Sequence, residues 1–264
     1  MKILFFGDIV GKIGREAIKK ILPELKKKYQ PDVLIANVEN LAHGKGVTAK
    51  TLTELKDLGF TCFTSGNHVW KKEDVAAAIS ASGATLITPL NDPRTPLGQG
   101  FAKLQIGSKT LIVVNLLGRV FIDEKDLTNP FSELDQLLDN YSDQPPMVIV
   151  DFHAEATSEK IALGWHTDGR LSAILGTHTH VPTADYKILP QGTAYVTDVG
   201  MVGPIDSVLG VKKELIIEKF LTDGPIVFKL LEAGEVEING IYLEINNSTN
   251  LAEKIEKISR IITV

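Results

Sequence analysis

The sequence has 264 residues, enough for a substantial hydrophobic core in one large domain or two ordinary ones. Hydrophobic residues make up 44% and charged residues 23% of the chain, which is near the average of globular proteins and excludes a disordered, collagen-like or coiled-coil class. The 28 Lys and Arg residues against 33 Asp and Glu residues give a formal net charge of −5, so non-specific binding to nucleic acid or to an anionic membrane is not expected.

Cysteine usage and hydropathy predict a cytoplasmic protein. Cys62 is the single cysteine, so neither an intrachain disulfide nor a thiolate zinc cluster can form. The N-terminal apolar stretch 3–7 is followed directly by Asp8 and is shorter than the ~7–15-residue core of a signal peptide. No stretch approaches the ~18 consecutive apolar residues of a transmembrane helix, so no membrane partner is expected.

Short apolar runs alternate with amphipathic segments in the first part of the chain, as in βαβ units, where buried strands lead into crossover helices. In chain order we predict a strand at 3–6, a helix at 15–29 with a kink or break at Pro23, a strand at 33–38, a helix at 48–58, a strand at 60–64, a helix at 71–82 and a short strand at 84–87. Residues 89–100 hold several proline and glycine residues and predict a small excursion at one rim of the fold rather than a domain linker.

The rest of the chain mixes hairpins with helices. We predict a hairpin of 101–106 and 110–116, a helix at 131–140, strands at 147–151, 171–175, 184–189 and 194–198, a helix at 214–221, paired strands at 226–231 and 235–245, and an amphipathic helix at 251–262. The turn at 190–192 makes the strands on either side of it a hairpin. Together these elements predict one α/β domain over residues 1–264, an α/β/β/α sandwich of two mixed sheets flanked by helices.

Polar side chains follow several of the predicted strands directly. They are Asp8, Glu39 with Asn40, Asn67 with His68, His153, and His178 with His180. Because the carboxyl ends of parallel strands share one edge of a sheet, groups far apart in the sequence can converge there. Oxygen and imidazole ligands suit a divalent cation, so the pattern predicts a metal site.

The two carboxylates stand in different contexts. Asp8 lies between glycines, where the backbone can turn sharply and approach a ligand, although by itself it also fits a helix cap or a turn. Glu39 ends a strand that is otherwise apolar. If buried it needs a cation or a hydrogen-bonding partner, and if exposed it is simply the rim of a strand.

The histidine segments carry the stronger signal. His178 and His180 lie two residues apart, so both face the same side of an extended chain, and metal binding is a common role of histidine. In Ser65-Gly66-Asn67-His68, Asn67 offers a carbonyl oxygen and His68 a proton, while an Asn-containing turn before a helix is the alternative interpretation.

The remaining histidines are less informative. His153 follows an apolar strand, and Asp151 or Glu155 is placed to orient its ring, although an exposed loop histidine is the alternative. His43 and His166 fit the protein surface better than the rim of a site.

The ordered series Gly-Asp, Glu-Asn, Gly-Asn-His, His and Gly-Thr-His-Thr-His over residues 8–180 resembles the calcineurin-like metallophosphoesterases. More narrowly, the start at 7–11, the segments 38–40 and 153–160, and the later segments 197–201 and 203–204 resemble the bacterial YmdB family over nearly the whole chain. Val10 stands where the broader superfamily has the histidine of an Asp-x-His motif, and Val69 stands where it has an acidic residue after Gly-Asn-His. The narrower family shares both departures, and Asn40 is the natural substitute for the missing histidine.

The resemblance implies a site for two divalent metal ions, iron or manganese with zinc as a further candidate. It implies that Asp8, Asn40 and His180 hold one metal, that Asn67, His153 and His178 hold the other, and that Glu39 bridges them. Metals about 3.5–4 Å apart can clamp a phosphoryl group and lower the pKa of a bridging water so that hydroxide attacks in line. His68 is then expected to act as the general acid that protonates the leaving oxygen.

The resemblance further implies a phosphodiesterase that opens 2′,3′-cyclic nucleotides to 3′-nucleotides, and it favours a homo-oligomer. The residues themselves support metal-dependent phosphoester hydrolysis, because a 3′,5′-cyclic nucleotide, a phosphomonoester or an RNA end suits the same metals. A metal-binding nucleotide sensor or regulatory scaffold with little turnover is the alternative. Peptide or amide hydrolysis is disfavoured because the sequence has neither a HExxH helix nor a recognised Ser-His-Asp order.

Overall fold

Two six-stranded sheets lie at the centre of the computed structural model, which describes residues 1–72, 75–96, 99–141, 145–225 and 227–264. The strand order of the first sheet is β10-β13-β1-β2-β3, and β14 pairs with β13. These strands are β1 (Lys2–Phe6), β2 (Val33–Asn37), β3 (Cys62–Thr64), β10 (Val202–Pro204), β13 (Glu235–Ile245) and β14 (Ala252–Thr263). β1, β2 and β3 are parallel, while β13 runs antiparallel to β1, β10 and β14.

The second sheet has the strand order β4-β5-β6-β7-β9-β8. Its strands are β4 (Phe101–Ile106), β5 (Lys109–Leu117), β6 (Met147–His153), β7 (Ala173–Thr177), β8 (Lys187–Ile188) and β9 (Ala194–Val196). The inner strands β5, β6, β7 and β9 are parallel, and the edge strands β4 and β8 are antiparallel to their neighbours. The predicted hairpins at both edges are therefore confirmed.

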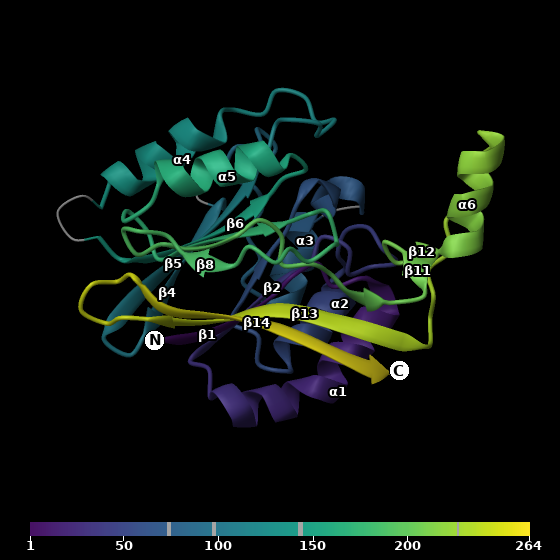
Figure 1. Cartoon of the computed structure of the whole chain (residues 1–264), viewed down its shortest axis with the longest axis horizontal. Coiled ribbons are helices and arrows are strands. Elements are labelled where there is room, and N and C mark those ends of the chain that lie inside the picture. Colours follow the sequence, from purple (N-terminus) through teal and green to yellow (C-terminus); the bar gives the residue numbers. More distant parts are fainter. Residues whose placement is uncertain (73–74, 97–98, 142–144, 226) are drawn as a thin grey trace.

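Helices cover the outer faces of both sheets (Figure 1). The first sheet is covered by α1 (Gly11–Tyr29), α2 (Ala49–Lys56) and α3 (Val75–Ser82), and the second by α4 (Pro130–Asp139) and α5 (Thr157–His166). The short 3-10 helix η1 (Asn67–Lys71) follows β3, and α6 (Lys213–Thr222) projects from the body beside β11 (Ser207–Val208) and β12 (Val211–Lys212). The predicted α/β/β/α sandwich is confirmed.

Alternating side chains of β1 show how the layers are held together. Leu4 and Phe6 pack among the helices on one face, whereas Ile3 and Phe5 pack between the two sheets against residues such as Val113 of β5. This is the two-residue period of a strand that is buried on both faces. Each such buried side chain contributes about 1.5–3 kcal/mol to folding.

The helix α1 differs from the prediction at two places. It begins at Gly11, and it passes through Pro23 without a break. Pro23 is exposed, so the hydrogen bond that proline removes lies on the solvent side of the helix, where the freed carbonyl group is open to water.

The C-terminal prediction is wrong. Residues 251–262 form no helix, because β14 pairs with β13 along nearly its whole length. The spacing of Ile255, Ile258 and Ile262 fits one face of a helix, but β-branched side chains also favour a strand, and the exposed edge of β13 supplies the pairing partner.

Smaller differences concern several short elements. Residues 226–231 do not pair with 235–245: residue 226 lies outside the described residues, and Leu230 instead forms an isolated bridge with Val211. Residues 84–87 contribute only the bridge between Phe63 and Leu86, and the helix α5 was not predicted. The described part of 89–100 is a loop, as predicted, and residues 73–74 and 97–98 lie outside the described ranges. No described helix is both long and apolar enough to span a membrane.

Candidate active site

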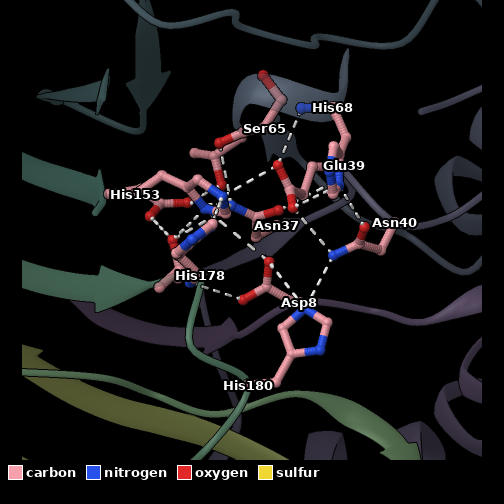
Figure 2. A network of polar contacts seen from close by, with 12 residues as sticks. Asp8, Asn37, Glu39, Asn40, Ser65, His68, His153, His178 and His180 are labelled. Atoms are coloured by element: carbon pink, nitrogen blue, oxygen red, sulfur yellow. Dashed lines mark hydrogen bonds and ion pairs between the residues drawn. The ribbon is translucent and has the colours of Figure 1, made fainter. Parts of the chain in front are cut away.

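The carboxyl ends of strands from both sheets meet at one place. β1 leads to Asp8, β2 leads to Glu39 and Asn40, and β3 leads to Asn67 and His68. From the second sheet, β6 ends at His153 and β7 leads to His178 and His180. Figure 2 shows the side chains of Asp8, Glu39, Asn40, His68, His153, His178 and His180 gathered in one network. The predicted convergence of these strand ends is confirmed.

Glu39 is the centre of the network. Its Oε2 lies 3.0 Å from Nε2 of His153, and its Oε1 lies 3.0 Å from Nδ2 of Asn40. Two groups of ligand atoms share it, one with His153 and His178 and the other with Asp8 and His180, and within each group all atoms lie within 4.8 Å of one another. Ligand atoms that bind one cation at about 2.0–2.2 Å are separated by roughly 3–4 Å, so each group is a candidate metal site and Glu39 belongs to both.

Two buried oxygen atoms lack partners at this site. Oδ1 of Asp8 and Oδ1 of Asn67 make no hydrogen bond, although both atoms are inaccessible to solvent. Burying an unpaired polar atom is costly, and a bound cation satisfies a carboxylate or amide oxygen. The residues present therefore fit the divalent metals that the sequence predicts.

Asn40 connects the two sides of the site. Its Nδ2 lies 3.0 Å from Nε2 of His180, and its Oδ1 lies 3.0 Å from Nδ1 of His68. An amide must present its oxygen to a cation, so ligation beside His180 requires the Asn40 amide to rotate by half a turn.

His68 stands beside the ligand residues at the start of η1. Its backbone N–H donates to Oε2 of Glu39 at 3.2 Å, and its Nδ1 lies 3.2 Å from Oε1 of Glu39. Because Nδ1 faces Glu39 and Asn40, Nε2 is the ring nitrogen left for a substrate. The side chain is 25% exposed, so solvent and small molecules can reach it.

The charges of the site are strongly coupled. Burial by itself would raise the pKa of Glu39, but the adjacent rings of His153 and His68 outweigh burial and hold that pKa well below its usual range. Burial would lower the pKa of His153, yet the carboxylates of Glu39 and Asp8 raise it to about 9. Burial and the neighbouring His153 lower the pKa of His178 to about 3. Burial raises the pKa of Asp8, because it outweighs the opposing charges of His153 and His180.

A layer of buried polar side chains supports the ligand residues. Nδ1 of His153 lies 2.9 Å from the hydroxyl of Thr177, which donates to Asp151 at 2.6 Å. Asp151 also accepts hydrogen bonds from Asn37 and Thr64. Burial raises the pKa of Asp151 to about 6. Asn37, Thr64 and Thr177 were not predicted, since nothing in a strand sequence distinguishes an inward polar residue that contacts another sheet.

The predicted orientation of His153 by Asp151 or Glu155 needs correction. No direct hydrogen bond joins Asp151 to His153, because Thr177 lies between them. Glu155 contacts a different ring: its Oε2 lies 3.0 Å from Nε2 of His178. His178 therefore lies between a half-exposed carboxylate and Nε2 of His153, which is 3.0 Å from its Nδ1.

A buried ion pair holds the loop that carries the His-x-His pair. Lys160 of α5 donates to the carbonyl of Thr177 and to Asp198, both at 2.8 Å. Asp198 also accepts the backbone N–H of Thr179 at 3.0 Å. The loop needs this support because His178 and His180 have positive φ angles of 103° and 66°, which are strained for residues other than glycine.

The close approach of the backbone to two ligand side chains explains why residue 66 is glycine. A Cβ atom on Gly66 would collide with the Glu39 carboxylate and the His153 ring, so only glycine lets the loop after β3 pass between the two ligand segments. Of the remaining histidines, His166 pairs with Asp135 away from this network. His43 is exposed, as predicted, and it also lines a cavity next to the site.

Comparison with known proteins agrees with the geometry. The model of the YmdB-like protein family matches residues 4–258. A Bacillus subtilis (strain 168) protein named 2′,3′-cyclic-nucleotide 2′-phosphodiesterase is 46% identical over 258 residues, which cover 98% of this chain and 96% of that protein. The crystal structure of a phosphatase from Mycoplasma pneumoniae superposes with a TM-score of 0.92 at 40% identity, covering 99% of this chain and 93% of that one.

A more distant structure shares the fold alone. The Haemophilus influenzae NAD nucleotidase superposes with a TM-score of 0.61 at 13% identity, covering 100% of this chain and 50% of that one. The family match and the high identity over nearly the full length confirm the resemblance drawn from the ordered motifs. The chain is a member of the YmdB-like family.

Proposed function

We propose that this protein is a two-metal phosphodiesterase that hydrolyses 2′,3′-cyclic nucleotides at the 2′ ester and releases 3′-nucleotides. The observation that carries the proposal is the position of Glu39, which is shared by two groups of ligand atoms while His68 stands beside it. The Bacillus subtilis relative, which bears the name of this activity, supports the choice of substrate.

We assign the ligands as two sets that share one carboxylate. Asp8, Asn40 and His180 hold one metal, Asn67, His153 and His178 hold the other, and Glu39 contacts both. Two divalent cations at this place supply positive charge for the phosphoryl oxygens and acidify a water molecule. The protein contributes the fixed positions of the ligands, through Thr177 behind His153 and through Asp198 behind the loop 177–180.

His68 is the proton donor in this proposal. The oxygen of a water molecule bonds to phosphorus while the bond from phosphorus to O2′ breaks, and Nε2 of His68 delivers a proton to O2′. The water keeps one hydrogen on the new phosphate oxygen and releases the other to solvent, from which His68 is reprotonated. The contact of Nδ1 with Oε1 of Glu39 holds the ring and leaves Nε2 for the substrate. Such proton transfer is worth about 10²–10⁴-fold in rate.

The decisive experiment separates an enzyme from a sensor. The protein is loaded in turn with iron, manganese and zinc, incubated with 2′,3′-cyclic AMP and with 3′,5′-cyclic AMP, and the products are separated by chromatography. We expect 3′-AMP from 2′,3′-cyclic AMP and loss of activity on chelation. Tight binding without turnover with every metal would reject the proposal in favour of a sensor, and 2′-AMP as the product would reject the assigned ester.

A further inference from the structure

A cavity of about 580 Å³ opens directly beside the candidate active site. Asn40, His68 and His180 line it from the side of the metal ligands. Its other polar walls are His43 and three lysines, and the described residues that line it include no carboxylate. The lysines are Lys45, Lys71 and Lys72. Small-molecule sites usually measure about 300–1,000 Å³, so this cavity is large enough for one nucleotide.

A second cavity of about 560 Å³ adjoins the first. The two share the lining residues His43, Phe228 and Leu230, so they are neighbours, and together they are called the channel. No candidate metal ligand is among the described residues that line the second cavity. Three more lysines and a single carboxylate, Glu232, line the second cavity among the described residues. The lysines are Lys12, Lys212 and Lys229.

The charge of this channel opposes that of the chain. The protein carries a formal net charge of −5, yet six lysines and one glutamate line the two cavities. Within the described ranges, none of the six ammonium groups has an ion-pair partner. They come from separate elements, including α1, the segment after β2, η1, β12 and the segment before β13. Unpaired cations that gather from distant parts of the sequence indicate a polyanionic ligand.

Phe228 stands where the two cavities meet. Its side chain is 54% exposed, and the ammonium groups of Lys45 and Lys219 lie 5.7 Å and 5.6 Å from the ring centroid. An exposed aromatic ring bordered by lysines is the combination by which proteins bind single-stranded nucleic acid, with bases on the ring and phosphates on the cations.

We propose that the channel binds the 3′-terminal segment of an oligoribonucleotide that ends in a 2′,3′-cyclic phosphate. This inference rests on the proposed function. The terminal nucleotide occupies the first cavity with its phosphate at the metal ligands, and the chain passes Phe228 so that its preceding phosphates lie among Lys12, Lys212 and Lys229. A cyclic mononucleotide has one phosphate, which the metals hold, and it leaves the second cavity and its cations without a ligand.

The test compares a short RNA with a mononucleotide. The value of kcat/KM is measured for 2′,3′-cyclic AMP and for a triadenylate ending in a 2′,3′-cyclic phosphate, at 50 and 200 mM NaCl. At low salt we expect kcat/KM for the triadenylate to be at least tenfold higher, mainly through KM. Each phosphate on a single strand contributes a slope of about 0.7 in log[salt], so two extra phosphates reduce that preference about sevenfold between the two salt concentrations.

Variants locate the effect in the second cavity. Lys12→Gln combined with Lys229→Gln is expected to remove most of the preference while kcat/KM for 2′,3′-cyclic AMP stays within twofold. Lys187→Gln, an exposed lysine on β8 outside both cavities, is the matched control and is expected to leave both values unchanged. Fluorescence anisotropy with a labelled triadenylate 3′-phosphate supplies a readout independent of turnover, and the double variant is expected to bind it at least fivefold more weakly.

The outcomes distinguish this inference from the proposed function. Hydrolysis of 2′,3′-cyclic AMP with an equal or lower kcat/KM for the triadenylate overturns the inference and leaves the proposed function standing. If the double variant loses kcat/KM equally for 2′,3′-cyclic AMP and for the triadenylate, the inference is also overturned. Failure to hydrolyse either substrate with any metal rejects the proposed function, and triadenylate binding that is insensitive to the double variant then rejects the channel as well.

Discussion

At the scale of single residues, the site depends on a few buried oxygen atoms whose surroundings favour a bound cation. Oδ1 of Asp8 and Oδ1 of Asn67 are buried without hydrogen bonds, and Glu39 is held ionised by His153 and His68 despite its burial. These features are costly in a protein without metals and favourable in one that binds two cations. Residues that hold metal and the residue that donates a proton are therefore expected to respond differently to substitution.

His68→Ala is expected to keep the metal content and to lose about 10²–10⁴-fold in kcat on 2′,3′-cyclic AMP, because the leaving O2′ then departs without a proton. A substrate with a 4-nitrophenolate leaving group needs no such proton, and its kcat should fall far less. Steady-state kinetics with both substrates and elemental analysis check this. An unchanged kcat on 2′,3′-cyclic AMP would remove His68 from the role of acid.

Asn67→Ala is expected to reduce the bound metal from two ions per chain towards one, because it deletes a ligand oxygen that has no other partner. Loss of one ligand or its support typically weakens metal binding about 10–100-fold. Metal content after dialysis against a weak chelator is the measurement. Asn140→Ala at the exposed end of α4 is the control, and equal metal content in the two variants would exclude Asn67 as a ligand.

At the scale of elements, the segment 89–96 braces the helix that carries His68. Asp92 is buried and accepts hydrogen bonds from Nε1 of Trp70 at 3.0 Å and from the guanidinium of Arg94 at 2.6 Å. Trp70 lies on η1, two residues after His68, so the excursion predicted from proline and glycine content is a support for the site. Nothing in the sequence of 89–100 shows this contact, because Trp70 and Asp92 meet only in the folded chain.

Asp92→Asn is expected to destabilise the protein by about 1–3 kcal/mol at pH 7, because Arg94 and Trp70 lose an ionised acceptor. Burial would raise the pKa of Asp92, but the hydrogen bonds and the charge of Arg94 outweigh burial and lower it. The ionised Asp92 therefore stabilises the folded protein fully above the pKa of an aspartate in the unfolded chain, about 3.9. This stabilisation is lost as the pH falls through the lower pKa of Asp92 in the folded protein.

Urea denaturation of wild type and Asp92→Asn at pH 7 and near pH 2.5 measures that difference. The gap between the two unfolding free energies should narrow at the acidic pH. Asp123→Asn, an exposed carboxylate in the same region, serves as the control and should show little change at either pH. A gap that stays constant or widens in acid would contradict the ion pair as its cause.

At the scale of the whole molecule, the active site exists because two sheets pack face to face. Ile3 and Phe5 of β1 contact the second sheet across the interior, and this packing places the ends of β6 and β7 opposite those of β1, β2 and β3. The fold also gathers lysines from distant segments around the channel, so the local charge is positive although the chain is acidic overall. The expected absence of non-specific nucleic-acid binding, the cytoplasmic location and the homo-oligomer stay predictions.

The accessibility of the Cys62 thiol tests this packing. It lies on β3 between the two sheets, and burial raises the pKa of its thiol to about 12. At pH 8 about one molecule in 10⁴ then carries the thiolate. A bulky aromatic disulfide reagent cannot reach the buried sulfur atom. We expect no reaction with a coloured aromatic disulfide in the native protein and full reaction in urea. Rapid native labelling, absent in a Cys62→Ala control, would show that the sheets do not pack as described.

Hydrophobic patterning predicted the strands of the parallel cores, most of the outer helices and the polar residues at the strand ends, whose role as metal ligands stays a prediction. Buried strands are recognisable because they are continuous apolar runs, and polar residues directly after several of them indicate a shared sheet edge. The tertiary structure alone decided that residues 252–263 form a strand, because pairing with β13 outweighs a spacing that also fits a helix. It also decided that Thr177 links His153 to Asp151, that Lys160 supports the His178 loop, and that six lysines share one channel. These are contacts between segments far apart in the chain, and periodicity along one segment holds no information about them.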